Sequence, residues 1–293
     1  PDGTQAWVPS KQDNVGRGAR RNGLALNFQN TVRAISSRIR LPEGTEDLAK
    51  RVDHDDSSVA TAAVYDRRGN FLFVALETSR EVAVVDAHGG WELFRIDVGR
   101  APQGLAISDD GSALYVHNFM DRTVQVVNLE PLMSRGENDA QVHAAIGTVG
   151  SEALSPQVLL GKQLFYDARD PRLARDRYMS CASCHNDGGA DGRVWDLSHA
   201  GEGLRNTISL RGRAGLGHGF LHWSANFDEV QDFEGQIRNL AGGLGLMSDQ
   251  DYFAGTRADP LGVAKAGRSA DLDALAAYVS SLSQYADSPW RGA

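Results

Sequence analysis

The residues best suited to chemistry are Cys181, Cys184 and His185, which form the run Cys-Ala-Ser-Cys-His. Two thiols three positions apart can join the two vinyl groups of a haem as thioethers, and the adjacent histidine then comes beneath the iron as its proximal ligand. A redox pair would instead follow a strand in a βαβ unit, and a zinc site would need a second pair of ligands. The chain has no other cysteine. The motif therefore predicts one covalently attached haem c.

The region around this motif is expected to be mainly α-helical with long loops. Ser155 and Pro156 have the residue types of a helix N-cap and first helical position, and Leu159 and Leu164 then share one face. A second helix is expected in DLDALAAYVSSLSQY, from Asp271 onward, where apolar residues recur at helical spacing. Glycine-rich loops separate the two helices. We therefore assign residues 151–293 to a c-type cytochrome haem domain.

The first half of the chain repeats one β pattern. RGNFLFVALETSREVAVVD and DGSALYVHNFMDRTVQVVN lie 42 residues apart, counted from Gly69 to Gly111, and DGTQAWVPSKQDN is a weaker copy. Each copy reads as a turn, an alternating strand, a polar turn and a second strand, with WELFRIDVG and PQGLAISDDG expected to complete a four-stranded unit. Such a period is typical of a propeller blade, and the alternative is a β-sandwich with coincidental spacing.

The repeat resembles the YVTN-type β-propeller repeat. The fold class expected is therefore multidomain: incomplete all-β propeller blades in residues 1–132, with an irregular insertion near 15–60, a linker at 133–150, and then the haem domain. Because propellers close with about 4–8 blades, three blades predict further ones before residue 1 of a longer native chain.

The surroundings of the haem motif resemble the bacterial di-haem cytochrome c peroxidase and MauG-like family. The resemblance is carried by LGKQLFYDARDPRLARDRYMSCASCH, LRNTISL and LHWSANFDEVQDFEGQI. It implies that residues 155–293 correspond to the first of two haem domains. The second haem domain is then expected outside this segment, beyond residue 293.

The resemblance also implies roles for single residues. Trp223 corresponds to the tryptophan that conducts electrons between the two haems, and Gln236 to the glutamine of the distal pocket. Arg205 and Asn206 correspond to the segment near the haem propionates, where arginine offsets carboxylate charge. The ordinary alternatives are core packing for Trp223 and a surface ion pair for Arg205.

One departure from the family concerns the catalytic carboxylate. The family carries a glutamate immediately before a methionine, and here Leu246 precedes Met247. Leucine cannot move a proton between the oxygens of bound peroxide. Glu234 is the candidate substitute, although its spacing of two from Gln236 predicts different helix faces for the two side chains.

The sixth ligand of the iron is not decided by the sequence. A methionine ligand raises the reduction potential, a second histidine lowers it, and an open position permits peroxide chemistry. The candidates are His199, Met247, His222 and His218. Separately, the run NDGGADGRVWD offers oxygen ligands for Ca²⁺, without the spacing of a defined calcium loop.

Composition excludes several classes of protein. The 293 residues include 30 basic and 38 acidic side chains, a net charge of −8, with no basic block that would suit nucleic acid. Mean hydropathy is −0.36, and no apolar run is long enough to cross a bilayer. Thioether attachment of haem takes place outside the cytoplasm, so we expect a periplasmic or extracellular bacterial protein, with surface anchoring as a further option.

Two functions remain open. The first is an oxidoreductase of the di-haem cytochrome c peroxidase type, which accepts peroxide or oxidises another substrate while the propeller serves recognition. The second is a non-catalytic cytochrome c that passes electrons between partner proteins, with the propeller as a docking surface. The missing glutamate favours the second, whereas the resemblance and Trp223 favour the first.

Overall fold

In a computed structural model of the chain, the structure describes residues 3–12, 23, 25, 27–28, 31–285 and 290. The chain divides into two compact units. The first comprises residues 1–152 and 166–180, and the second comprises residues 153–165 and 181–293.

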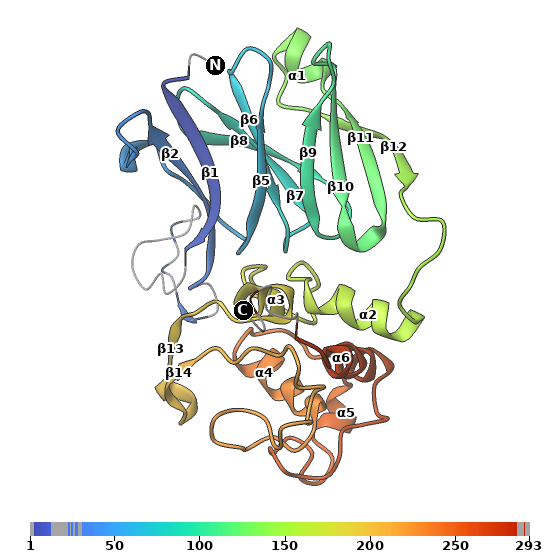
Figure 1. The fold of residues 1–293 in the computed structure, drawn as a ribbon. Helices are drawn as coiled ribbons and strands as arrows, with labels where there is room; N and C mark the ends of the chain where they lie inside the picture. Colours follow the sequence, from blue (N-terminus) through green and yellow to red (C-terminus); the bar gives the residue numbers. More distant parts are fainter. Residues whose placement is uncertain are drawn as a thin grey trace. The chain divides into compact units, whose positions relative to one another are not determined.

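The first unit contains three four-stranded antiparallel sheets (Figure 1). The first sheet has the order β1-β2-β3, with β4 also pairing with β2; the other two are meanders in the orders β5-β6-β7-β8 and β9-β10-β11-β12. Their bounds are β1 Gln5–Gln12, β2 Arg33–Arg40, β3 Thr45–Glu46, β4 Val52–His54, β5 Ala60–Tyr65, β6 Phe71–Leu76, β7 Glu81–Asp86, β8 Trp91–Asp97, β9 Pro102–Ile107, β10 Ala113–Asn118, β11 Thr123–Asn128 and β12 Gln141–Gly147. The predicted propeller-type blades are confirmed.

The blade boundaries differ from those expected. The strand in PQGLAISDDG is β9, which opens the third sheet instead of completing the second. The stretch assigned to a linker contains β12, the edge strand that pairs with β11. Part of the expected insertion forms β2, β3 and β4 of the first sheet, while most of its early residues lie outside the described part of the chain.

The repeat is visible in equivalent hydrogen bonds of two turns. Before β6, Gly69 N donates to Asp66 O at 3.1 Å, and before β10, Gly111 N donates to Ser108 O at 2.9 Å. Both glycines have positive φ, 75° and 76°, which L-residues adopt at a cost. Polar side chains also brace the two turns, because Asp66 Oδ1 accepts from Phe71 N and Ser108 Oγ accepts from Ala113 N. The sequence period therefore corresponds to a repeated turn geometry.

The second sheet is buried on both faces. Leu72, Val74 and Leu76 of β6 pack into a cluster with the first sheet, whereas Phe73 packs into a cluster with the third. Alternate side chains of a strand point to opposite faces, so a run of apolar residues fits a blade covered on both sides. Burial of such side chains stabilises the unit by roughly 1.5–3 kcal/mol each.

The segment Tyr166–Ser180, which precedes the cysteine motif, belongs to the first unit. Ala168 N donates to Thr78 O in the turn between β6 and β7 at 2.9 Å. The adjacent Asp167 carboxylate pairs with Arg80, and Arg169 pairs with Asp97 at 2.8 Å. The chain leading into the haem motif is therefore bound to the second blade.

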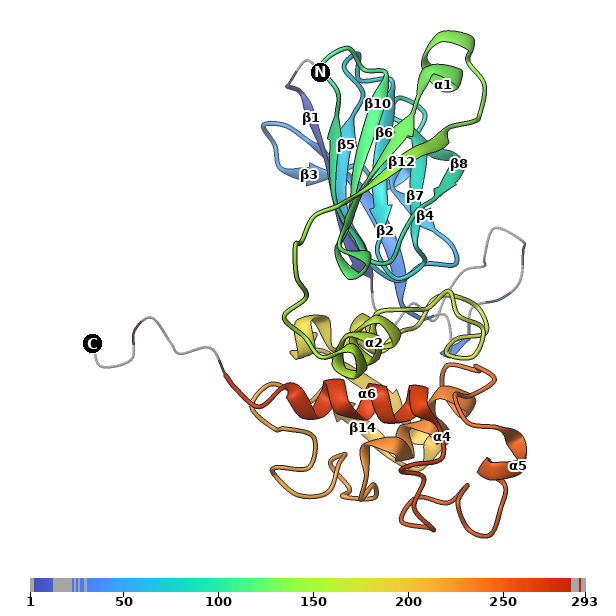
Figure 2. The same ribbon diagram turned by 90° about the vertical axis from the view of Figure 1, so that its right-hand side faces the viewer.

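The second unit is built around two packed helices, α2 (Pro156–Phe165) and α6 (Ala270–Ser281), which lie side by side (Figures 1 and 2). Ser155 Oγ accepts from Val158 N at 3.3 Å, as expected for the helix N-cap. Gly161 permits the close approach, because a Cβ there would lie 1.8 Å from Ala274 O. Phe165 packs edge-on against Tyr278 with ring centroids 5.1 Å apart.

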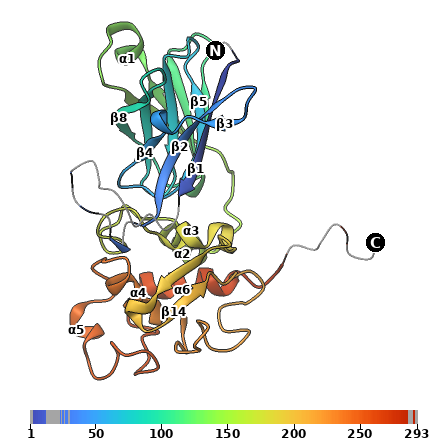
Figure 3. The same ribbon diagram turned by 90° about the vertical axis from the view of Figure 1, so that its left-hand side faces the viewer.

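The remaining elements of this unit are short and joined by long loops, which agrees with a mainly α domain. One feature was not expected, a two-stranded antiparallel hairpin (Figure 3). The bounds are α3 Cys181–Cys184, β13 Val194–Leu197, β14 Gly203–Asn206, α4 Phe233–Asn239 and α5 Asp249–Tyr252, with 3-10 turns at Asn186–Gly188, Ser198–Ala200 and Val230–Asp232.

Candidate haem site

The cysteine motif forms the single turn α3. His185 N donates to Cys181 O at 2.9 Å, which closes the turn and brings the histidine directly after the two thiols. Both cysteines are half-buried and neither forms a disulfide. Burial raises the pKa of the Cys181 thiol to about 11, so its surroundings disfavour a thiolate. An uncharged thioether suits this environment better than a metal-bound or reactive thiolate.

His185 is oriented by a main-chain carbonyl. Its Nδ1 lies 3.2 Å from Gly189 O, and because a carbonyl can only accept, Nδ1 must carry the proton. The lone pair is then on Nε2. Histidines that bind a metal commonly donate their other ring nitrogen to such an oxygen, which fixes the tautomer. The side chain is therefore in the state that a proximal haem ligand requires.

The hairpin β13–β14 brings together two residues predicted near the haem. Arg205 and Asn206 end β14, and the indole Nε1 of Trp223 donates to Asn206 O at 2.9 Å. Trp223 is 61% exposed, so it is not a core residue. Within the described residues, the buried Nε of Arg205 has no hydrogen-bond partner, and its nearest carboxylate oxygen, on Glu202, is 3.6 Å away. An unsatisfied guanidinium nitrogen fits the neighbourhood of a haem propionate.

Glu202 is a residue that the sequence reasoning missed. Its carboxylate accepts from Ser224 Oγ at 2.8 and 2.7 Å and from Asn226 Nδ2 at 2.7 Å. Asn226 in turn contacts His222, with Asn226 Oδ1 2.8 Å from His222 Nδ1. Glutamate and asparagine so far apart in the sequence carry no periodic signal, and only the folded loop brings them together.

Glu234, the candidate substitute for the missing glutamate, is buried and hydrogen-bonded. The side chain is 0% exposed, and its oxygens accept from Leu246 N at 2.9 Å and Met247 N at 3.1 Å. Arg238 also pairs with it at 2.8 Å. Both oxygens therefore accept hydrogen bonds from the loop 246–247. The catalytic role considered for Glu234 stays a prediction.

Gln236 lies on α4 and is half-buried. Its side-chain amide makes no hydrogen bond to other described residues, which leaves the amide available to a ligand. Among the candidate sixth ligands, His199 and His218 are exposed, Met247 is buried, and His222 is half-buried.

The part of the chain that the structure describes contains neither a metal cluster nor a helix able to span a membrane. Within the described residues, no group of three or more histidine, cysteine or acidic side chains could hold a metal ion, so the Ca²⁺ expectation finds no support there. Asp191, in the run considered for calcium, instead accepts from Trp195 Nε1 at 3.0 Å. None of the helices that the structure describes has the length and hydropathy to cross a bilayer.

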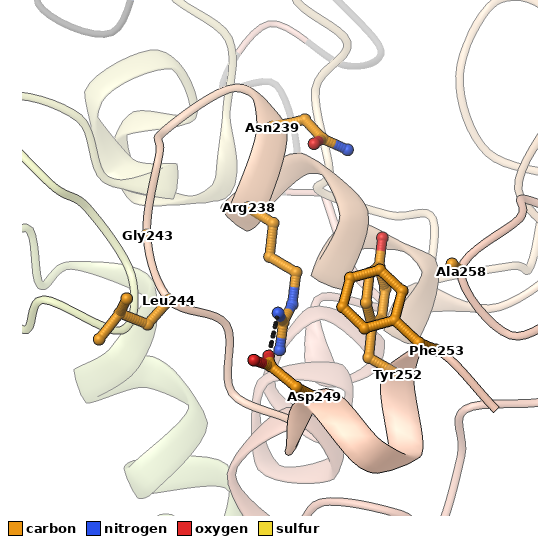
Figure 4. A pocket seen from close by; sticks show the side chains of 8 residues that line it. All are labelled: Arg238, Asn239, Gly243, Leu244, Asp249, Tyr252, Phe253 and Ala258. Atoms are coloured by element: carbon orange, nitrogen blue, oxygen red, sulfur yellow. Dashed lines mark hydrogen bonds and ion pairs between the residues drawn. The ribbon is translucent and has the colours of Figure 1, made fainter.

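The second unit also has an open pocket of about 630 Å³ beside α4 and α5 (Figure 4). Arg238 spans it toward Asp249, at 2.7 Å, and stacks over the Tyr252 ring at 4.4 Å. Since Arg238 is already paired, the pocket offers no uncompensated charge. None of the predicted haem-binding residues lines it; the lining residues are Arg238, Asn239, Gly243, Leu244, Asp249, Tyr252, Phe253 and Ala258.

A polar cluster in the first unit has the atom order of a hydrolytic triad. Ser36 Oγ lies 2.9 Å from His54 Nε2, and His54 Nδ1 lies 2.9 Å from Glu92 Oε2. Ser36 and His54 are both 0% exposed, so a substrate cannot reach the hydroxyl. Arg95 pairs with the same glutamate at 2.8 Å. The cluster therefore joins β2, β4 and β8.

One protein-family model matches the region around the cysteine motif. Residues 155–241 match the family model of the di-haem cytochrome c peroxidases. The match confirms the resemblance seen in the sequence, over less than a third of the 293 residues. It contains the cysteine motif, the hairpin, Trp223 and Gln236, and ends before Leu246 and Met247. The match is consistent with the haem c attachment that the cysteine motif predicts.

Solved structures are similar to part of the chain. Hydrazine synthase from Kuenenia stuttgartiensis is 22% identical, with 41% of this chain and 35% of that chain covered, at a TM-score of 0.31. A β-propeller domain from Myceliophteria thermophila is 15% identical, with 40% of each chain covered, at a TM-score of 0.33. A putative 6-phosphogluconolactonase from Bacteroides fragilis is 15% identical, with 44% of this chain and 38% of that chain covered, at a TM-score of 0.33. Each match spans less than half of the other chain. Among proteins with curated descriptions, none matches the chain.

Proposed function

We propose that this chain is a covalent haem c oxidoreductase of the di-haem cytochrome c peroxidase type, whose propeller blades serve to recognise a substrate or partner. Cys181 and Cys184 would hold the haem through thioethers, and His185 would be its proximal ligand. The substrate is peroxide or another compound that the haem oxidises.

The observation that carries the proposal is the hydrogen bond of His185 Nδ1 to Gly189 O. It leaves Nε2 as the nitrogen with the lone pair, directly after two half-buried cysteines. The family match over residues 155–241 covers this motif and is consistent with the assignment.

Each residue of the site would have its own role. Bound haem supplies an iron that accepts and donates single electrons. Arg205 would offset the charge of a propionate through its unsatisfied Nε. Gln236 would offer its free side-chain amide as a hydrogen-bond donor to a small ligand. Trp223, exposed at the end of the hairpin, would conduct electrons toward a partner.

The alternative is a non-catalytic electron carrier. It is favoured by one observation, that Leu246 stands in the place of the family's glutamate and that Glu234 is occupied with main-chain hydrogen bonds. Neither Leu246 nor Glu234 would then move protons on peroxide. The propeller blades would in that case dock an electron donor or acceptor protein.

Location and partners follow from the chemistry of attachment. Thioether formation outside the cytoplasm supports a periplasmic or extracellular site in a bacterium, with a surface anchor as an option. A second haem domain, outside residues 1–293, would be the nearest electron partner. The acidic charge of −8 does not favour nucleic acid.

The test is to express the chain with a haem-attachment system and record optical and electron paramagnetic resonance spectra with and without hydrogen peroxide. Peroxide-dependent oxidation of a reduced cytochrome or dye supports the enzyme. Covalent haem that exchanges electrons but never turns over peroxide supports the carrier. Failure to attach any haem would overturn both.

A further inference from the structure

The first sheet contains four strands but is only three strands wide. β3 pairs with Ile39 and Arg40 of β2, and β4 pairs with residues 34–36 of the same strand. Both therefore lie along one edge of β2, whereas β1 lies along the other. In the residues that the structure describes, β1 pairs with β2 alone, so its second edge carries no strand. We call this second edge the open edge of β1.

Equivalent hydrogen bonds show which strand of a blade β1 is. One main-chain bond of 2.8 or 2.9 Å recurs in all three sheets: Leu41 N to Thr4 O, Ala87 N to Asn70 O, and Leu129 N to Ser112 O. Each acceptor directly follows a glycine of positive φ: Gly3 at 73°, Gly69 at 75° and Gly111 at 76°. β1 and β2 therefore correspond to β6 and β7 in the second sheet, and to β10 and β11 in the third.

In the second and third sheets, the strand that corresponds to β1 has a neighbour on both edges. β5 pairs with β6, and β9 pairs with β10, each antiparallel and directly before the glycine turn in the sequence. The first sheet has no counterpart of β5 or β9 in the described part of the chain. The strand it lacks is therefore the first strand of a blade, on the open edge of β1.

The open edge of β1 presents main-chain groups that suit a further strand. Alternate residues of a strand direct their N–H and C=O groups to opposite edges. Because Thr4 O is bonded on the β2 side, Gln5 and Trp7 direct their main-chain groups to the open edge. Pro9 follows at the next such position and has no N–H. We therefore expect a strand on this edge to be held at Gln5 and Trp7, with one donor fewer at Pro9.

The turns of the other two sheets indicate how such a strand would end. Asp66 and Ser108 stand three positions before the turn glycines of the second and third sheets. Each accepts from its glycine through the main-chain oxygen, and from the second residue after that glycine through a side-chain oxygen. In the first sheet this second residue is Gln5, and the position three before Gly3 lies directly ahead of residue 1. An equivalent turn requires a short side chain with an oxygen there.

We infer that the open edge of β1 binds one antiparallel strand of the same protein, which lies directly ahead of residue 1 and enters β1 through a turn at Gly3. The Pro-Asp-Gly sequence of residues 1–3 is typical of such a turn. The strand has the six-residue length of β5 and β9 and, like them, mainly small and apolar side chains. This inference concerns the blades and does not depend on the attachment of haem.

The test supplies a strand of known sequence. A copy of residues 57–66, which contain β5 and end in aspartate, is fused directly in front of Pro1, so that the copied aspartate stands three positions before Gly3. The matched control carries Val64→Pro in the copy alone. Val64 of β5 pairs with Phe73, the counterpart of Trp7, so proline removes an N–H that the new ladder needs.

Hydrogen exchange of single amides, followed by NMR, gives the result. With the extension, the main-chain amides of Gln5 and Trp7 should exchange about tenfold more slowly than in the 293-residue chain. The amides of Ala6 and Val8 should change less, because they already face β2. The proline control should protect neither pair. Equal exchange of Gln5 and Trp7 with and without the extension, or equal protection by the proline control, would overturn the inference.

A second measurement identifies the strand in the native protein. Protein purified from its natural source is sequenced by mass spectrometry from Pro1 toward its N-terminus. We expect a strand-like run of small and apolar residues that ends in Asp, Asn, Ser or Thr directly ahead of Pro1. A native chain that begins at Pro1, or one without a side-chain oxygen at that position, would contradict the inference. Either result leaves the haem oxidoreductase untouched, because its test is covalent haem and peroxide turnover.

Discussion

The indole nitrogen of Trp223 donates a hydrogen bond to the main-chain oxygen of Asn206, 2.9 Å away. These two residues stand 17 positions apart in the sequence, and the family resemblance assigned both to the haem site. The contact ties the loop that carries Trp223 to the end of the hairpin β13–β14, while 61% of the indole stays exposed. An exposed aromatic ring held in a fixed orientation is suited to passing electrons to a partner.

The first prediction concerns Trp223→Phe. The change removes one hydrogen bond of a largely exposed side chain and should lower the free energy of unfolding by about 1 kcal/mol or less. Electron transfer with a partner protein, measured by stopped-flow absorbance, should slow at least several-fold while the haem spectrum stays the same. An unchanged rate would remove the role of electron conduit from Trp223.

The second prediction concerns Glu234→Gln. The amide would turn its NH₂ toward main-chain N–H groups that now donate to a carboxylate, and Arg238 would lose its buried partner. The midpoint of urea unfolding should fall, corresponding to about 2–4 kcal/mol. The control is Glu130→Gln, whose ion pair with Arg135 is about half exposed and should count for under about 1 kcal/mol.

The same variant separates a structural from a catalytic role. If Glu234 only holds the loop 246–247, any loss of peroxide turnover should track the fraction of unfolded protein. A folded Glu234→Gln protein that binds haem normally and has lost turnover would show that the carboxylate does take part in chemistry.

The third prediction is a pH dependence of the first unit. Burial opposes ionisation of Glu92, but the hydrogen bond from His54 and the charge of Arg95 outweigh it and lower its pKa from 4.5 to about 2. The folded protein thus binds this proton less readily than the unfolded chain. The resulting stabilisation, roughly 3 kcal/mol at most, is complete above pH 4.5 and disappears as the pH falls from 4.5 to 2.

Urea unfolding followed between about pH 6 and about pH 2 checks this dependence, because that interval contains the range over which the stabilisation is lost. Glu92→Gln should be less stable at neutral pH and should show a flatter profile below pH 4.5. A variant with the same slope as the wild type would mean that other carboxylates account for acid unfolding.

The fourth prediction concerns the segment that leads into the haem motif. Asp167→Asn breaks a pair in which the carboxylate side chain is 4% exposed, so it should destabilise the first unit by about 2–3 kcal/mol. Arg172→Ala disrupts an exposed contact with Asp170, with the arginine 44% exposed, and serves as the control. Limited proteolysis between residues 166 and 180 should accelerate in the first variant only.

The sequence predicted the features that depend on local pattern. The period between Gly69 and Gly111 reflects a turn repeated with the same main-chain hydrogen bonds, and the cysteine motif reflects a single helical turn. The boundaries predicted for the blades were less accurate. The strand β9 pairs with β10, the next strand in the sequence, and nothing in PQGLAI indicates which sheet this strand joins.

Contacts between residues distant in sequence could not be predicted. Glu202 accepts a hydrogen bond from Asn226, which is 24 positions away in the sequence, and Asp167 accepts one from Arg80, which is 87 positions away. Helical or strand periodicity predicts faces of an element but not which loops meet. The main-chain partners of Glu234 could not be predicted for the same reason, since Leu246 and Met247 lie on a loop of no regular spacing.

The most direct measurement is the intact mass of the denatured polypeptide, together with its pyridine haemochrome spectrum, for the wild type and for Cys181→Ser, Cys184→Ser and the double variant. We predict that the wild type retains the mass of one haem with two thioethers, that each single variant shifts the haemochrome band, and that the double variant loses the haem to acid extraction. A wild-type chain with the bare polypeptide mass, after expression with a competent haem-attachment system, would contradict the assignment.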